Sequence, residues 1–184
     1  MSMIYMQSGS FGKTIAVFNR MKGLEDSTKT VKSDAVIYSG RPVTLYRTPG
    51  DDLGKIVPVT DEASRVYGLA KFQKNSYLDE VVDDFGFYGS KKGTVIVTGI
   101  VEVTHNVFTD PSGVETTVKN YDDAQTYLPM QGLFVELTNP EKLGMITNRA
   151  SAANNETFLG FVLGIDTTNA VLQIMLSKPS EAGL

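Results

Sequence analysis

Short apolar runs alternate with turn residues along most of the chain. The runs begin at Ala35 and recur at short spacing, with Gly, Pro, Asp and Ser between them. Residues 94–104 give the strongest strand signal because they are dense in valine, isoleucine and threonine, and Gly99 in their middle predicts a bulge or a bend. Strands spaced in this way are typical of antiparallel sandwiches and barrels. We therefore expect a mainly β fold, a β-barrel or sandwich.

Helical patterning is scarce. Residues 77–85 and 122–127 are compatible with only a turn or two of helix, and Pro129 would end the second. The polar stretches between the apolar runs are rich in residues that favour turns. The sequence thus predicts tight loops, rather than helices, between its strands.

The chain contains an internal echo, in which a later segment repeats the glycine and apolar positions of an earlier one. Three matches are 92 positions apart: Gly40 with Gly132, Val43 with Val135, and Leu45 with Leu137. Residues 53–56 match 143–146 at a separation of 90, and Gly68 matches Gly160 at 92. Each copy ends in an apolar strand, at 95–97 and at 171–176. Unless the similarity arises by chance, two small units should pack on each other or around one barrel.

The internal echo and the composition of the N-terminal segment divide the chain into an N-terminal arm and a β domain. Residues 1–33 mix Gly, Ser, Thr and Lys with scattered apolar side chains, and we expect a partly ordered leader or an arm that becomes ordered against a partner. The partner-binding side chains of such an arm would be Tyr5, Phe11 and Phe18. A β domain follows over 34–184, with possible tandem units at 34–106 and 126–178.

Composition excludes several classes of protein. The 184 residues carry a net charge of −4 without any cluster of Lys and Arg, so a nucleic-acid partner is not expected. There is no cysteine, which excludes disulfides, a thiol nucleophile and cysteine-based metal sites, and suits folding in a reducing cytoplasm. The N-terminus does not resemble a secretion signal, and no apolar stretch approaches the length of a membrane span.

The chain offers little material for catalysis. His105 is the only histidine; it follows the 94–104 run, just before a turn at residues 110–113, and we expect a structural role for it. The acidic pairs 51–52, 83–84 and 122–123 are adjacent residues, which point to opposite faces of a strand and do not converge on one site. Weak divalent-ion binding between loops and a hydrolase with dispersed carboxylates are the alternatives. We therefore predict a protein that is not an enzyme and uses no cofactor or metal.

Four segments of the first copy resemble a known family. They are residues 40–45 (Gly-Arg-Pro-Val-Thr-Leu), 54–60 (Gly-Lys-Ile-Val-Pro-Val-Thr), 66–70 (Val-Tyr-Gly-Leu-Ala) and a Gly-initiated strand at 93–99. In this order they resemble the capsid decoration, or cement, proteins of tailed bacteriophages. The resemblance covers about residues 35–104 and extends more weakly over 128–177 through the echo.

This resemblance implies a structural virion protein that binds the outer surface of the assembled capsid. Members of the family are often trimers, bridge subunits of the major capsid protein, stabilise the shell, and commonly use an N-terminal arm, which would fit residues 1–33. The implied location is the capsid exterior, after synthesis in the host cytoplasm. This chain is longer than the simplest members and has an apparent two-copy layout, which leaves its stoichiometry and placement open.

Two other functions remain as alternatives. The chain could be another virion β-module, such as a tail-tube, baseplate or head-fibre component. It could also be a β domain that binds a carbohydrate or another ligand, for which Phe85, Phe87 and Tyr88 would form a stacking platform. Core packing or a contact surface is the simpler interpretation of these aromatic residues.

Overall fold

The fold is mainly β, as expected, and built from antiparallel sheets. The computed structural model describes residues 14–15, 25–60, 65–71, 92–109, 114–149 and 157–177. A single 3-10 turn, η1 (Pro140–Lys142), lies among them. The segment 122–127 forms a hydrogen-bonded turn rather than a helix, with the Gln125 amide donating to the Asp122 carbonyl at 3.1 Å, while 77–85 lies outside the described residues.

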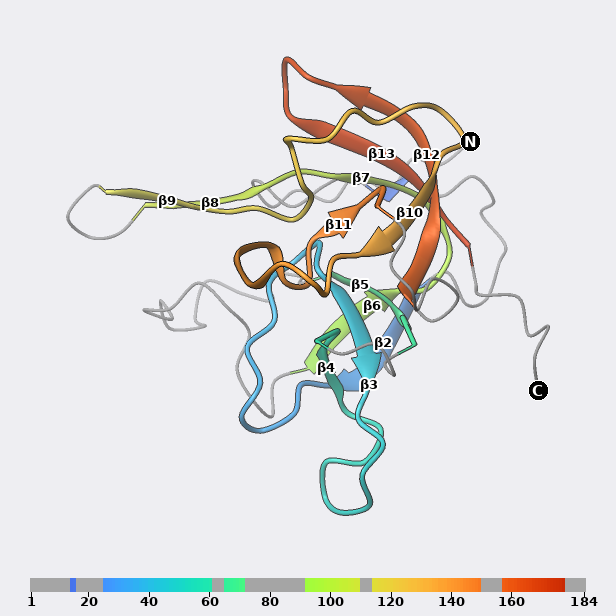
Figure 1. Ribbon diagram of the computed structural model, residues 1–184. Coiled ribbons are helices and arrows are strands. Elements are labelled where there is room, and N and C mark those ends of the chain that lie inside the picture. Colours follow the sequence, from blue (N-terminus) through green and yellow to red (C-terminus); the bar gives the residue numbers. More distant parts are fainter. Residues whose placement is uncertain are drawn as a thin grey trace.

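The strands of the first sheet lie within the range 25–97, which we call unit 1. Its five strands lie in the order β2-β6-β5-β3-β4, in the lower half of Figure 1. Their bounds are β2 (Glu25–Thr30), β3 (Pro42–Leu45), β4 (Ile56–Pro58), β5 (Gly68–Lys71) and β6 (Lys92–Ile96). All neighbouring strands are antiparallel.

The second sheet is formed mainly by residues 99–177, which we call unit 2, and lies in the upper half of Figure 1. Its order is β1-β7-β13-β12-β10-β11. The bounds are β1 (Thr14–Ile15), β7 (Gly99–Val103), β10 (Gly132–Val135), β11 (Ile146–Thr147), β12 (Phe158–Asp166) and β13 (Val171–Leu176). A separate two-stranded ribbon, β8 (Asn106–Thr109) with β9 (Glu115–Val118), belongs to the same unit.

The two units share one topology. Strands β2, β6, β5, β3 and β4 of unit 1 occur in the same order as β7, β13, β12, β10 and β11 of unit 2. An isolated parallel bridge joins Val31 to Ile56 in unit 1, and its counterpart joins Tyr121 to Ile146 in unit 2, with both members displaced by 90 positions. The expectation of two similar strand–turn–strand units is therefore confirmed.

The expected register of the echo needs one correction. Gly40 corresponds to Met130, and not to Gly132, so the matches proposed for this strand are shifted by two positions. The Gly40 amide donates to the Ala70 carbonyl at 2.8 Å, and the Met130 amide donates to the Val162 carbonyl at the same distance. Both residues adopt a left-handed backbone, with φ of 82° and 64°. Glycine identity is thus a poor guide here, because methionine occupies the same backbone conformation in the second unit.

The ribbon is an insertion in unit 2 relative to unit 1. Asp26 on β2 and Val101 on β7 occupy corresponding places and are 75 positions apart, whereas Val31 and Tyr121 are 90 positions apart. The difference corresponds to residues 106–120, which comprise β8, β9 and their connections. In unit 1 the chain passes from β2 straight to the first bridge.

The run 94–104 does not form one strand. Strand β6 ends at Ile96 and β7 begins at Gly99, which has a φ of 126°. The two strands belong to different sheets, so the bend expected at Gly99 is the point at which the chain crosses from unit 1 to unit 2.

The N-terminal boundary also differs from the expected one. Residues 25–33 belong to unit 1 and not to an arm, because β2 pairs with β6 and the Val31 side chain is fully buried. Within the rest of the expected arm, β1 pairs with β7 at the edge of the second sheet.

Each unit buries six corresponding side chains. In unit 1 they form a core cluster of its own: Val31, Ile37, Val43, Ile56, Ala70 and Val95. Their counterparts in unit 2 belong to a larger cluster: Tyr121, Tyr127, Leu133, Ile146, Val162 and Ile174. This larger cluster also contains four residues of unit 1, namely Val59, Val66, Leu69 and Ile96. The two units therefore share one hydrophobic core.

Candidate protein-interaction surfaces

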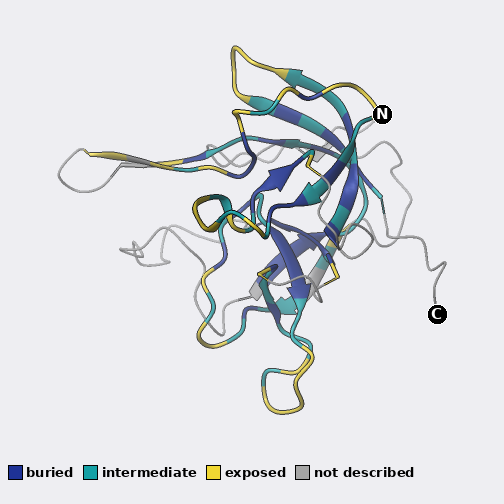
Figure 2. Ribbon diagram, in the orientation of Figure 1, coloured by how far each residue is buried: buried dark blue, intermediate teal, exposed yellow. Residues whose placement is uncertain are grey.

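The β8–β9 ribbon extends away from the two sheets (left in Figure 1) and is mostly exposed (Figure 2). Four residue pairs define its register, from Asn106 opposite Val118 to Thr109 opposite Glu115. The valines Val107 and Val114 are 44% and 58% exposed. The ribbon is therefore a candidate surface for binding another protein.

Two buried asparagines hold the base of the ribbon. Asn106 Nδ2 donates to Asn120 Oδ1 at 3.2 Å and to the Ser39 carbonyl at 3.0 Å. Asn120 Nδ2 donates to the same Ser39 carbonyl at 2.9 Å and to the Thr104 carbonyl at 2.7 Å. Because Ser39 belongs to unit 1, these bonds fix the ribbon against both units.

His105 has a structural place beside this base. Its Nδ1 accepts a hydrogen bond from the Asn120 amide at 3.3 Å, and its ring lies 4.3 Å from the Tyr121 ring, centroid to centroid. Burial lowers the pKa of His105 below its usual value, although Asp123 opposes the shift. The imidazole is therefore neutral at pH 7 and packs as part of the ribbon base.

Asp122 anchors the segment that follows the ribbon. Its two carboxylate oxygens accept hydrogen bonds from Lys142 Nζ at 2.8 and 2.9 Å, and Gln125 Nε2 donates to it at 3.0 Å. Burial alone would raise the pKa of Asp122, but these hydrogen bonds outweigh it and hold the pKa below its usual value. The residues at the corresponding positions of unit 1 are Lys32 and Asp52, so the two charges are exchanged between the units.

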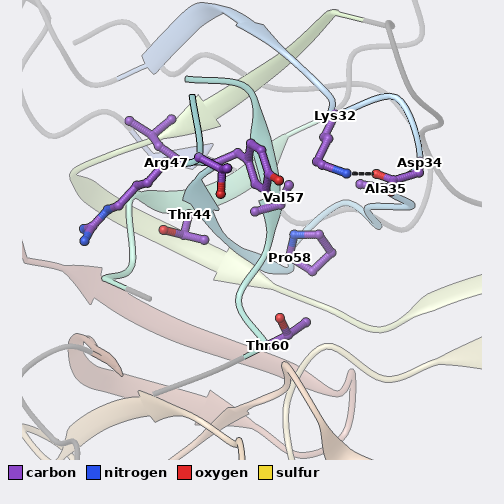
Figure 3. Close-up of a pocket in the computed structure, with 11 residues that line it drawn as sticks. Lys32, Asp34, Ala35, Thr44, Arg47, Val57, Pro58 and Thr60 are labelled. Atoms are coloured by element: carbon purple, nitrogen blue, oxygen red, sulfur yellow. Dashed lines mark hydrogen bonds and ion pairs between the residues drawn. The ribbon is translucent and has the colours of Figure 1, made fainter. Parts of the chain in front are cut away.

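A cavity of about 510 Å³ lies on unit 1 between β3, β4 and the segment after the first bridge (Figure 3). Its lining combines apolar side chains with charged ones at its ends: Leu45, Val57 and Pro58 with Lys32, Asp34 and Arg47. Figure 3 shows Arg47 on the opposite side from the Lys32–Asp34 ion pair.

The charged groups of this cavity are partly satisfied by one another. Lys32 pairs with Asp34, which raises the pKa of Lys32 and lowers that of Asp34, and Lys32 Nζ lies 5.0 Å from the centre of the Tyr46 ring. Such an arrangement could take an extended peptide segment with apolar side chains. In unit 2 the position of Tyr46 is held by Glu136, whose carboxylate accepts bonds from the amide and hydroxyl of Thr138 at 2.8 and 2.6 Å.

The described residues contain no group of three or more acidic, histidine or cysteine side chains that could hold a metal ion. Of the acidic pairs, Asp52 accepts hydrogen bonds from Lys55 at 2.7 Å and from Ser33 at 3.2 Å, and the Lys55 bond lowers its pKa. Asp123 pairs with Lys119 at 2.8 Å. Among the described helices, none is both long and apolar enough to cross a membrane.

Several residues singled out from the sequence lie outside the described part of the chain. These are the candidate arm residues Tyr5, Phe11 and Phe18, the aromatic residues Phe85, Phe87 and Tyr88, and the acidic pair 83–84. The turn expected at residues 110–113 also lies outside the described residues. The anchoring asparagines carried no signal in the sequence, because their role depends on Ser39 of the other unit.

A comparison with protein-family models and with curated proteins finds no match for this chain.

Proposed function

We propose that this chain is a structural virion protein that binds the outer surface of an assembled tailed-phage capsid and stabilises it by bridging major capsid protein subunits. The observation that carries the proposal is the position in the fold of the four segments that resemble capsid decoration proteins. Residues 40–45, 54–60, 66–70 and 93–99 contain most of β3, β4, β5 and β6, four neighbouring strands of one sheet. The resemblance thus follows a folding unit rather than scattered turns.

The layout of the molecule supports a role in binding. Two units with a shared core give a rigid body, and the anchored ribbon presents Val107 and Val114 away from it. A shell offers many identical sites, so modest affinity at each contact is multiplied when an oligomer, such as the trimer common in the family, engages several subunits. A protein that binds the assembled shell, and not its free subunits, stabilises the shell by mass action. Such a role needs no catalytic centre or cofactor.

Co-sedimentation tests this function. The purified chain is mixed with expanded, DNA-free shells of the phage that encodes it, and separately with free capsid subunits. We expect the chain to pellet with shells and not to bind free subunits. Assembly into tubes, together with no binding to shells, would favour the tail-tube or baseplate alternative.

Ribbon variants test which surface makes the contact. We expect Val107→Glu with Val114→Glu to weaken shell binding about tenfold or more, because a buried charge replaces apolar contact area. Val36→Glu is the control, since Val36 is an exposed valine of unit 1, 37% accessible, that does not belong to the ribbon. An equal loss of shell binding in the ribbon variant and the control would show that the ribbon does not make the contact. The proposal that the chain binds shells would not be affected.

A further inference from the structure

One face of unit 1 is covered by unit 2. It consists of the turn 38–41 together with Val59, Val66, Leu69 and Ile96, all four of which are at most 7% exposed and belong to the shared core cluster. We call it the docking face of unit 1. At its edge, Arg41 Nη1 donates to the Leu143 carbonyl of unit 2 at 3.0 Å.

The corresponding face of unit 2 carries larger apolar side chains. Strand pairing equates Leu69 with Phe161 and Ile96 with Met175, and Phe158 precedes Gly160 by two positions as Val66 precedes Gly68. These three side chains of unit 2 are only partly buried, and the counterpart of Val59, 90 positions further on, is the exposed Arg149. The ring centroids of Phe158 and Phe161 lie 5.2 Å apart in an edge-to-face contact.

The turn beside this face is the most exposed apolar site among the described residues. Residues 128–131 correspond to the turn 38–41 of unit 1, and they expose Leu128 by 61% and Met130 by 63%. We call this turn, with Phe158, Phe161 and Met175, the docking face of unit 2. No described segment covers the two exposed side chains of the turn.

Met130 is also in an unfavourable backbone conformation. Its φ is 64°, in the left-handed region, where a residue with a Cβ is destabilised. Unit 1 has Gly40 at this place, where a Cβ would lie 2.6 Å from Asn120 Nδ2. A strained, exposed methionine where the sister unit has glycine suggests that the side chain is retained for a contact.

We propose that the docking face of unit 2 binds a second copy of this chain. The choice of partner follows from the chain itself. Among the described residues, the docking face of unit 1 is covered by unit 2, a unit of the same fold. In the internal contact the docking face meets the loop of Leu143 and Gly144, and the corresponding loop in unit 1 is that of Leu53 and Gly54. Leu53 is 59% exposed and available to the second copy.

The contact joins unlike surfaces of the two copies. The turn 128–131 of one copy meets the Leu53 loop of the next, just as the turn 38–41 meets the Leu143 loop within one chain. Each copy in such a contact uses one of its two surfaces and keeps the other free for a further copy. The assembly therefore closes into a ring or grows into an open chain of copies. This contact would be the interface of the oligomer on which the proposed function relies, and in that respect it rests on the proposed function.

Sedimentation velocity of the purified chain tests the proposal without any capsid. We expect the sedimentation coefficient to rise with protein concentration over the range up to about 0.2 mM, as self-association requires. Leu128→Glu with Met130→Glu should weaken it about tenfold or more, and Leu53→Glu should do the same. Val36→Glu is the control, since Val36 is an exposed valine, 37% accessible, that belongs neither to the turn 128–131 nor to the Leu53 loop, and it should associate like the wild type.

Mixing the two defective variants gives the sharper test. Each retains one intact surface, so the mixture should form dimers that neither variant forms alone, and nothing larger. A wild-type chain that stays monomeric would overturn the proposal, because something other than a second copy would then cover the face. The proposal would also be overturned if Leu53→Glu associated as strongly as the wild type, or if Val36→Glu lost association.

Two further readouts separate this proposal from folding effects and from the proposed function. Met130→Gly should weaken association without lowering the melting temperature, since glycine removes both the contact and the backbone strain. The monomeric variants should still bind shells, with lower avidity. Failure of the wild type to bind shells would count against the proposed function while leaving the self-association result intact.

Discussion

At the scale of single residues, environment rather than residue type decides what the polar groups do. His105 was the one candidate base in the sequence, yet its Nδ1 accepts a bond from the Asn120 amide and its ring stacks on Tyr121. The sequence could predict that a lone histidine at a strand end is structural. It could not predict the partners, because Asn120 is brought to His105 only by the folding of the ribbon between them.

The buried histidine gives a prediction for pH dependence. Because the folded-state pKa of His105 lies below its unfolded value, the unfolded chain binds the proton more readily, and stability should fall as the pH drops below about 6.5. His105 is the only histidine, so no other side chain with an ordinary pKa titrates between pH 5.5 and 7. Urea denaturation across this range should show the decline in the wild type. A His105→Gln variant should lack it, and an equal decline in both would contradict the assignment.

At the scale of elements, the echo in the sequence predicted two units and most of their correspondence. Gly68 and Gly160 are correctly matched, because at both positions the backbone of the paired strand lies too close for a Cβ. The first strand was misaligned, since Gly40 and Met130 share a backbone conformation but not a residue type. The ribbon could not be aligned at all, because unit 1 has no counterpart to residues 106–120.

The matched glycines predict where a methyl group is most destabilising. A Cβ at Gly160 would lie 2.0 Å from the Met175 carbonyl oxygen, and one at Gly68 would lie 2.3 Å from that of Ile96. These oxygens belong to paired strands and cannot move aside, so Gly160→Ala should lower the free energy of unfolding by about 3 kcal/mol or more. Gly54→Ala is the control: it also has a positive φ, 78°, but open space around it. The control should lose only about 1–2 kcal/mol in chemical denaturation, and an equal loss in both would contradict the steric account.

At the scale of the whole molecule, the shared core should make the two units unfold together. Ile96 is 4% exposed and belongs to unit 1, but it packs in the cluster formed mainly by unit 2. We expect Ile96→Ala to lower the stability by about 2–5 kcal/mol and to preserve a single unfolding transition. Hydrogen exchange should then accelerate in β12 and β13 as well as in β5. Val43→Ala is the comparison, because Val43 belongs to the cluster confined to unit 1. If hydrogen exchange became faster only in unit 1 in both variants, the two units would be independent.

The proposed function requires the two-unit body to bind an assembled shell and stabilise it. Calorimetry of shell disruption tests this most directly, with expanded shells heated alone and in the presence of saturating purified chain. We predict a higher disruption temperature with the chain present, rising with its concentration as mass action requires. An unchanged disruption temperature at saturating concentration would contradict the account.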